Sequence, residues 1–365
     1  MSLVMANILD LLIDLHNRRL RKPPKFNPTK YVAAWSEDDV LTKGGARISA
    51  LVVILRTPGC SWFRSTTTVG GCTMCGYIND CLAPETPLTP DDLLEQFRSA
   101  VDKYENKQFD LIKIFTSGSF IDDAEVPKAA QMSIMELCQN VGVSRVIFES
   151  RPEFVTSQKL QDLSTIYDGE LQLAIGLETS NDDIRKFAIN KGFKFQDYCN
   201  AVKIVRDFGI LIKTYLLLKP LFVTEFDGIS DVLQSIRALH DGLTDCISIN
   251  PVNIQKNTLV EYLFNRRDYR PPWLWSVVSV LDQGYEILKD TNINLISQPT
   301  AGGTRRGAHN CGNCDKSVLE EINKFSISND PQALRSVTCN CRASWRDTIE
   351  LENVIKSPLD LSVLE

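Results

Sequence analysis

The sequence predicts an α/β protein: a (β/α)6 partial barrel followed by a small cysteine-rich metal module. Three observations support this prediction. Apolar, β-branched segments alternate with helical patterns between residues 46 and 300. Polar and charged residues follow several of these segments, where the carboxyl ends of parallel strands would lie. After about residue 300, glycines, paired cysteines and short helical patterns replace the alternation.

Six short apolar segments are typical of strands that are covered on both faces. They begin at Ala50, Leu111, Arg145, Leu171, Ile212 and Asp245, and a possible further one begins at Ile293. Helical patterns lie between them, and one starts with the capping signal Thr89–Pro90. This alternation indicates parallel strands with right-handed crossovers. Periodicity alone does not distinguish a partial barrel from a doubly wound sheet, but ligands bind at the strand carboxyl ends in both.

The same patterns divide the chain into three parts. Residues 1–45 form an expected N-terminal helical extension, because the segment from Met5 to Leu20 has an amphipathic pattern. Residues 46–300 form the partial barrel, and residues 301–365 form the metal module.

Composition and charge limit the possible partners. No apolar run is long enough to cross a bilayer, and the first residues lack the layout of a signal peptide, so we expect a cytoplasmic protein with no membrane partner. The formal net charge of −6 argues against autonomous RNA binding, which usually requires a basic excess. This average charge does not exclude a local basic face, or a partner that supplies the RNA.

Three cysteines lie on a glycine-rich loop directly after the first predicted strand. Cys60 is followed by the pair Cys72 and Cys75, and glycines 59, 70, 71 and 76 would permit positive φ values and close backbone approach. A structural zinc ion and a closed [4Fe–4S] cluster each take four protein ligands. Three cysteines would leave one iron of such a cluster open to an outside ligand such as S-adenosylmethionine (SAM). Cys81 as a fourth ligand, and a zinc ion on the loop, are the alternatives.

Seven segments in this order resemble radical SAM enzymes. They are "PGCSWFR…GGCTMCGY", "FTSGSFID", "FESRPEFV", "GLETSNDDIRKFAINKGF", "LLLKPLFVTE", "INPVNIQKNTLVEYLF" and "GGTRRGAHNCGNCD". The gap between the first two cysteines is longer than in the commonest pattern and is similar to the branch that contains the Elongator catalytic subunit. Over nearly the whole chain, the segments resemble the radical SAM proteins of archaeosine biosynthesis (RaSEA).

The resemblance implies a [4Fe–4S] cluster on Cys60, Cys72 and Cys75, with SAM bound at its open iron. The residues expected around SAM and the substrate follow predicted strands or the cysteine loop: Tyr77, Ser117, Gly118, Ser119, Glu149, Arg151, Glu178 and Lys191. We expect Glu149, Arg151 and Glu178 to have catalytic roles beside the cysteines. Glu149 and Arg151 are two residues apart, so their side chains would point the same way on an extended chain.

Each of these positions also has a purely structural interpretation. Residues 115–120 could form an ordinary turn between a strand and a helix. Glu149 and Arg151 could form an ion pair at a strand end. Glu178 could stabilise a helix N-terminus, and Lys191 could be a solvated lysine.

The reaction implied by the resemblance is a lyase step in tRNA modification. Reductive cleavage of SAM would yield methionine and a 5′-deoxyadenosyl radical, which removes hydrogen from the lysine side chain on a lysine-modified 7-deazaguanine of the tRNA D-loop. Scission of a C–N bond would leave archaeosine. The implied partners are tRNA, the lysine-transferring archaeosine synthase and a one-electron donor. Another, Elongator-like tRNA-modifying radical SAM enzyme and a non-enzymatic zinc-binding adaptor are the alternatives.

Four further cysteines form two pairs near the C-terminal end. They are Cys311, Cys314, Cys339 and Cys341. Two such pairs are typical of a closed, structural zinc site. A second iron–sulfur cluster is the alternative, because the spacing of the cysteines alone does not separate the two.

Overall fold

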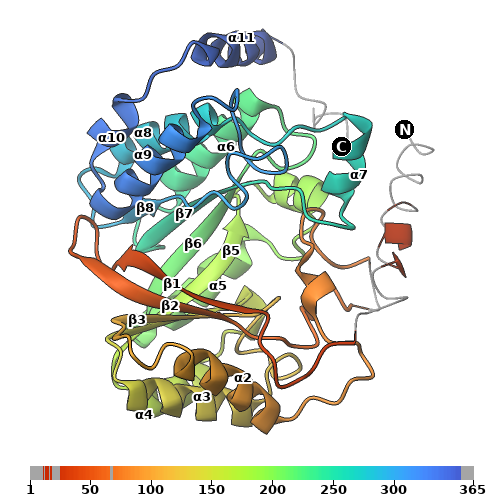
Figure 1. The fold of residues 1–365 in the computed structure, drawn as a ribbon, viewed down its shortest axis with the longest axis vertical. Coiled ribbons are helices and arrows are strands. Elements are labelled where there is room, and N and C mark those ends of the chain that lie inside the picture. Colours follow the sequence, from red (N-terminus) through yellow and green to blue (C-terminus); the bar gives the residue numbers. More distant parts are fainter. Residues whose placement is uncertain (1–10, 12, 16, 19–24, 66–68, 355–365) are drawn as a thin grey trace.

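The computed structural model has one sheet of eight strands that are neighbours in the order of the sequence (Figure 1). It describes residues 11, 13–15, 17–18, 25–65 and 69–354. The strands are β1 (Ala33–Val40), β2 (Arg47–Ile54), β3 (Leu111–Phe115), β4 (Arg145–Glu149), β5 (Glu170–Glu178), β6 (Leu211–Leu218), β7 (Cys246–Pro251) and β8 (Asn294–Ile296). Strands β2 to β8 are parallel, and β1 pairs antiparallel with β2 at one edge.

The strand order decides between the two folds that the sequence leaves open. A doubly wound sheet reverses its order at a switch point, which places helices on both faces. Here the order never reverses, so every crossover advances in the same direction, and the helices lie around the outside of a curved sheet (Figure 1). This confirms the predicted partial barrel.

The helices connect and cover these strands. They are α2 (Pro90–Asp102), α3 (Lys128–Val141), α4 (Ser157–Ile166), α5 (Phe195–Asp207), α6 (Glu225–Ala238), α7 (Leu259–Arg266), α8 (Leu274–Leu288), α9 (Asp315–Ser328), α10 (Pro331–Arg335) and α11 (Cys341–Val354). Short 3-10 turns span Tyr77–Asp80 and Pro152–Phe154, and a π-helical segment spans Ile184–Ile189. Thr89 caps α2 in a capping box with Asp92, as its sequence signal predicts.

Strand β1 corrects one expectation. Residues 1–45 are expected to be helical, but residues 33–40 form a strand paired with β2. Two acids in this strand, Glu37 and Asp39, form ion pairs with Lys113 of β3, which accounts for charged residues in a strand. The amphipathic helix predicted from Met5 to Leu20 lies largely outside the described residues.

The segment after residue 300 packs against the barrel. Helices α9 and α10 contact α8, and α11 contacts α6. Val318, Ile322 and Phe325 of α9 are fully buried in the same apolar core as the barrel strands. The domain boundaries at residues 45 and 300 stay predictions.

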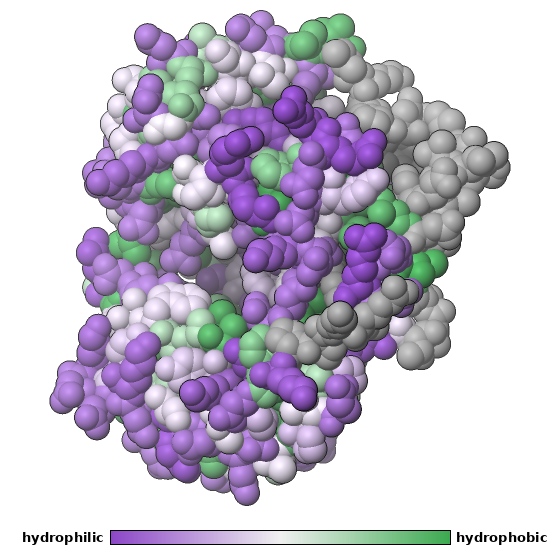
Figure 2. All heavy atoms as spheres, turned by 45° about the vertical axis from the view of Figure 1, so that its right-hand side comes forward, coloured by the Kyte–Doolittle hydropathy of each residue, from purple (hydrophilic) through white to green (hydrophobic). Residues whose placement is uncertain are grey.

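Two features of the fold bear on partners. None of the helices that the structure describes is both long and apolar enough to span a membrane. The face in Figure 2 is mainly hydrophilic, with hydrophobic side chains scattered among polar ones.

Candidate active site

A cavity of about 570 Å³ opens at the carboxyl ends of the parallel strands and extends into the barrel. Most of the residues expected around a cofactor line it: Cys60, Cys72, Cys75, Tyr77, Ser117, Gly118, Glu149, Arg151, Glu178 and Lys191. Ser119 does not. Its side chain is fully buried, and its Oγ accepts a hydrogen bond from the Arg151 amide at 3.0 Å. Ser119 therefore stabilises the wall of the cavity without lining it.

The cysteine loop is held by residues that follow β5. Asn190 Nδ2 donates to the carbonyls of Val69 and Gly71, both at 2.9 Å, and Thr73 Oγ1 donates to the Ala188 carbonyl at 2.7 Å. These bonds fix the part of the loop that presents Cys72.

The loop glycines serve two different purposes. Gly59 and Gly71 have φ values of +99° and +88°, as expected for this loop. Gly76 has a φ of −107°, so positive φ is not the reason for glycine there. A Cβ at Gly76 would lie 2.7 Å from the Gln255 side chain, and one at Gly70 would lie 1.8 Å from the Trp62 carbonyl oxygen. Close packing accounts for these two glycines.

The three cysteines of the loop line one cavity but are less tightly clustered than the late cysteines. Across the described residues, the late cysteines are the one set of His, Cys, Asp and Glu whose ligand atoms all lie within 4.8 Å of one another. Cys60, Cys72 and Cys75 face one cavity but do not meet that criterion. Burial raises the pKa of Cys60 to about 11, although the positive charge of Arg151 opposes that rise.

Cys81 lies beside this loop, but it is not among the residues that line the cavity. Its Sγ donates to Ser117 Oγ at 2.9 Å, and burial raises its pKa to about 12. A Cβ at Gly59 would lie 2.8 Å from the same sulfur. The thiol is therefore packed between Ser117 and the start of the loop.

Glu125 shapes the turn after β3, and the sequence analysis missed it. Its carboxylate accepts hydrogen bonds from the amides of Ser119 at 2.7 Å and Ser117 at 3.2 Å, and from Thr57 Oγ1 at 2.8 Å. Burial raises its pKa to about 7. A Cβ at Gly118 would lie 2.5 Å from Glu125 Oε2 and 2.7 Å from Cys60 Cα, so only glycine fits between the turn and the cysteine loop.

The guanidinium group of Arg151 contacts hydrogen-bond acceptors and aromatic rings on most of its sides. Nη1 donates to the Lys191 carbonyl at 2.9 Å, Nε donates to Glu153 at 2.5 Å, and the rings of Trp62 and Phe193 lie 5.5 and 5.3 Å away. Nη2 is buried and has no hydrogen-bond partner in the described part of the chain. A buried, unsatisfied donor beside Cys60 suits a negatively charged cluster with thiolate ligands.

Glu178 and Lys191 are paired with each other. Lys191 Nζ lies 2.6 Å from Glu178 Oε1, and the two side chains are 13% and 9% exposed. Burial alone would lower the pKa of Lys191, but the Glu178 carboxylate raises it well above its usual range. A Cβ at Gly176 would lie 2.7 Å from both charged atoms, so this glycine leaves the space that the pair fills.

Glu149 lies at the end of β4, and both Glu149 and Tyr215 of β6 line the cavity. Burial raises the pKa of Glu149 to about 8, and Lys191 and Lys213 oppose that rise. Tyr215 and Lys213 also line the cavity, and the sequence analysis missed both. They are the polar residues at alternate positions of an apolar strand, which is the signal that could have identified them.

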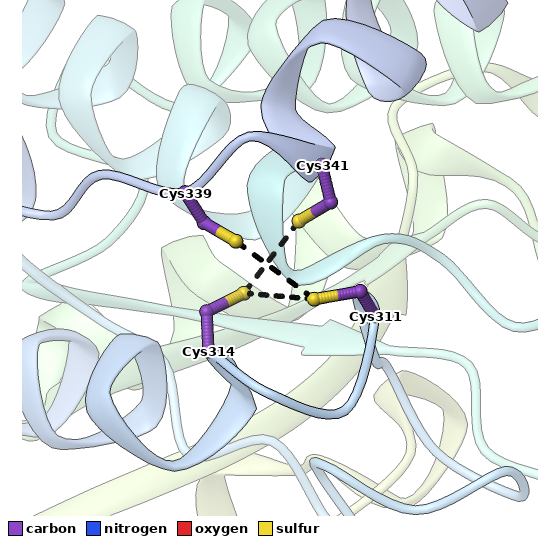
Figure 3. Close-up of side chains that lie close together, drawn as sticks. All are labelled: Cys311, Cys314, Cys339 and Cys341. Carbon is purple, nitrogen blue, oxygen red and sulfur yellow. Dashed lines mark hydrogen bonds between the residues drawn. The ribbon is translucent and has the colours of Figure 1, made fainter.

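The late cysteines converge as the sequence predicts. Figure 3 shows their four sulfur atoms pointing toward one another. The Sγ–Sγ distances are 3.8 Å between Cys311 and Cys314, 3.8 Å between Cys311 and Cys339, and 3.6 Å between Cys314 and Cys341. A regular tetrahedron of thiolates at about 2.3 Å from a zinc ion has edges of about 3.8 Å. This geometry fits one tetrahedral ion.

Neighbouring groups orient these thiols. Trp275 Nε1 donates to Cys341 Sγ at 3.2 Å, and Asn310 Nδ2 donates to Cys314 Sγ at 3.5 Å. Asp315 accepts hydrogen bonds from the amides of Asn310 and Gly312 and thereby shapes the turn of the first pair. Hydrogen bonds from neighbouring groups that orient the ligands are typical of metal sites in proteins.

The fold and the site together define an α/β partial-barrel protein with three cysteines on the loop after its first parallel strand. No family model matches the chain. It is 39% identical over 344 residues to archaeosine synthase subunit beta of Methanosarcina acetivorans, covering 94% of this chain and 96% of that protein. It is 38% identical over 320 residues to archaeosine synthase subunit beta of Thermococcus kodakarensis, covering 86% and 95%. The chain therefore belongs to the archaeosine synthase subunit beta family.

Solved structures are also similar. Elp3 of Methanocaldococcus infernus aligns with a TM-score of 0.49 at 14% identity, covering 64% of this chain and 59% of that chain. A queuine lyase from Clostridium spiroforme, bound to SAM and queuine, aligns with a TM-score of 0.45 at 17% identity, covering 71% and 94%.

Proposed function

We propose that this protein is the radical SAM lyase of archaeosine formation, which cleaves the C–N bond of the lysine side chain on a lysine-modified 7-deazaguanine in tRNA. The observation that carries the proposal is the meeting of three loop cysteines at one cavity, in a chain of the archaeosine synthase subunit beta family.

The donor set at the cavity fits a [4Fe–4S] cluster better than a single ion. Cys60, Cys72 and Cys75 would hold it, since three thiols at one cavity leave one iron open for SAM, whereas a structural zinc ion takes four protein ligands. The buried Arg151 Nη2 supplies an unsatisfied donor near them. When bound, the cluster and SAM supply a one-electron cleavage that delivers a carbon radical for hydrogen abstraction.

The chain's own residues would bind and orient the reactants. Glu178 and Lys191 present a carboxylate and an ammonium group side by side at the cavity, suited to ribose hydroxyls and a carboxylate. Glu125 fixes the turn of Ser117 and Gly118 against the cysteine loop. Tyr77 lines one side, and its hydroxyl, which is neutral near pH 7, can donate or accept a hydrogen bond.

A second subunit would make part of the contacts with the tRNA. The relatives are named as subunit beta, and this chain has a net charge of −6. A complex with the lysine-transferring archaeosine synthase would bring tRNA to the cavity without a strongly basic surface on this chain.

The late cysteines would hold one structural zinc ion. Their sulfur spacing matches the edges of a tetrahedral thiolate site, and all four positions are protein ligands. The ion would tie the turn before α9 to the start of α11.

Product analysis tests the function. The anaerobically reconstituted protein is incubated with SAM, dithionite and lysine-modified tRNA, and the nucleosides are measured by mass spectrometry. We expect archaeosine to appear together with 5′-deoxyadenosine and methionine. SAM cleavage without archaeosine would favour another tRNA-modifying radical SAM reaction, and a colourless protein that cleaves no SAM would favour the zinc-binding adaptor.

A further inference from the structure

The inner end of the cavity contains two lysines with different surroundings. Lys113 of β3 and Lys213 of β6 both line the cavity inside the barrel, and their residues are 2% and 5% exposed. Lys213 also lines a second cavity of about 480 Å³ at the opposite end of the barrel, so it lies deep in the interior.

Lys113 is neutralised within the protein. Its Nζ lies 2.5 Å from Glu37 Oε1 and forms a second ion pair with Asp39. Both acids come from the edge strand β1. Because two carboxylates already neutralise its positive charge, Lys113 does not require an anionic ligand.

Lys213 lacks such a partner. None of the ion pairs found among the described residues includes it, and its closest aromatic contact is the ring of Tyr215, 5.6 Å from Nζ. Asp39 and Glu149 influence it only as more distant charges. A buried ammonium group without a hydrogen-bonded counter-charge is costly, so this position favours a ligand that supplies an anion.

The space around Lys213 is open to a ligand. Its neighbours across the sheet, Ala174 on β5 and Cys246 on β7, have small side chains, and so does Ser248, the neighbour of Tyr215 on β7. The space over Gly176, the other neighbour of Tyr215, is filled by the Glu178–Lys191 pair. Glu149 faces the same cavity from β4, and in the register of the sheet it pairs with Ala174, as Lys213 does from the other side. An unpaired cation and a carboxyl group therefore face one space.

We propose that this inner space is a subsite for an α-amino-acid head group, with Lys213 receiving the carboxylate and Glu149 receiving the ammonium group. A simple anion would use Lys213 but not Glu149, whereas a zwitterion uses both. The assignment of this head group to the substrate's lysine rests on the proposed function. SAM carries the same chemistry in its methionine part, but Lys213 is the third residue of β6 (Leu211–Leu218) and also borders the second cavity, whereas the cysteine loop follows the carboxyl end of β2.

Direct binding tests the subsite without any turnover. The full, anaerobically reconstituted chain is titrated calorimetrically with L-lysine, with cadaverine, which lacks the carboxylate, and with 6-aminohexanoate, which lacks the α-ammonium group. We expect L-lysine to bind at least about tenfold more tightly than either analogue. K213M should remove the preference over cadaverine, K213R should retain most of it, and E149Q should remove the preference over 6-aminohexanoate. Thermal unfolding of each variant verifies that it is folded.

The results separate the possible explanations. Equal affinity for L-lysine and cadaverine, or no measurable L-lysine binding, would overturn the subsite. If K213M weakens SAM binding as much as L-lysine binding, the subsite belongs to SAM and the assignment to the substrate is wrong. The product assay is independent: archaeosine formation without L-lysine preference refutes only the subsite, and L-lysine preference without archaeosine formation refutes only the proposed reaction.

Discussion

The buried pair of Glu178 and Lys191 allows a quantitative prediction. The charged atoms are 2.6 Å apart and the side chains are only 9% and 13% exposed, so water screens them little. K191M would leave the Glu178 carboxylate in the same place without its counter-charge. Removal of one partner of a buried pair costs about 3–5 kcal/mol of unfolding free energy, and the low end applies here because the pair borders a cavity. We expect K191M to lose about 3 kcal/mol.

The double variant E178Q/K191M distinguishes lost pairing from lost packing. It removes both charges, so it should recover most of the loss. Urea unfolding of the reconstituted full chain measures both effects, and K186M is the matched control, because Lys186 is an exposed lysine in the same segment and should change stability by less than about 0.5 kcal/mol. The reasoning is refuted if K191M is as stable as the wild type, or if the double variant is as unstable as K191M.

Three further predictions concern the cavity and the late cysteines. Burial raises the pKa of Glu149 in the folded protein from 4.5 to about 8, so the free energy of unfolding falls as pH rises between these values. In urea titrations, E149Q should show a smaller fall and should be more stable than the wild type at pH 8 by about 2–4 kcal/mol. The same pH dependence in both proteins would contradict the argument from burial. G118A would bring a Cβ to 2.7 Å from Cys60 Cα, and iron analysis should show that at least half of the cluster is lost. Full iron content would contradict this prediction, because it would mean that the turn moves to accommodate the Cβ. C314S should reduce zinc from one ion per chain to none in metal analysis and lower the thermal midpoint, and retained zinc would contradict the four-thiolate site.

Much of the fold could be predicted because the parallel strands are continuous apolar runs. The segments beginning at Ala50, Leu111 and Ile212 illustrate this, since both faces of each strand are covered. Strand β1 could not be predicted in the same way. Its acids look like surface residues until Lys113, far along the chain, is known to pair with them.

The same distinction between local sequence signals and contacts distant in sequence applies to the site residues. Cysteines and charged groups directly after strands could be predicted, because strand ends meet at one edge of a parallel sheet. Glu125 could not, since it follows a turn and only the structure brings its carboxylate to the amides of Ser117 and Ser119. Ser119 shows the opposite error: it belongs to the right segment, but its side chain points behind the cavity wall.

The central proposal, an open iron on the three-cysteine loop, is tested most directly by electron paramagnetic resonance of the reduced, reconstituted full chain with and without SAM. We predict a [4Fe–4S] signal that changes when SAM is added, persists in C81S and disappears when Cys60, Cys72 and Cys75 are replaced by alanine. A signal that SAM leaves unchanged, or one that C81S abolishes, would contradict a cluster held by these three thiols alone.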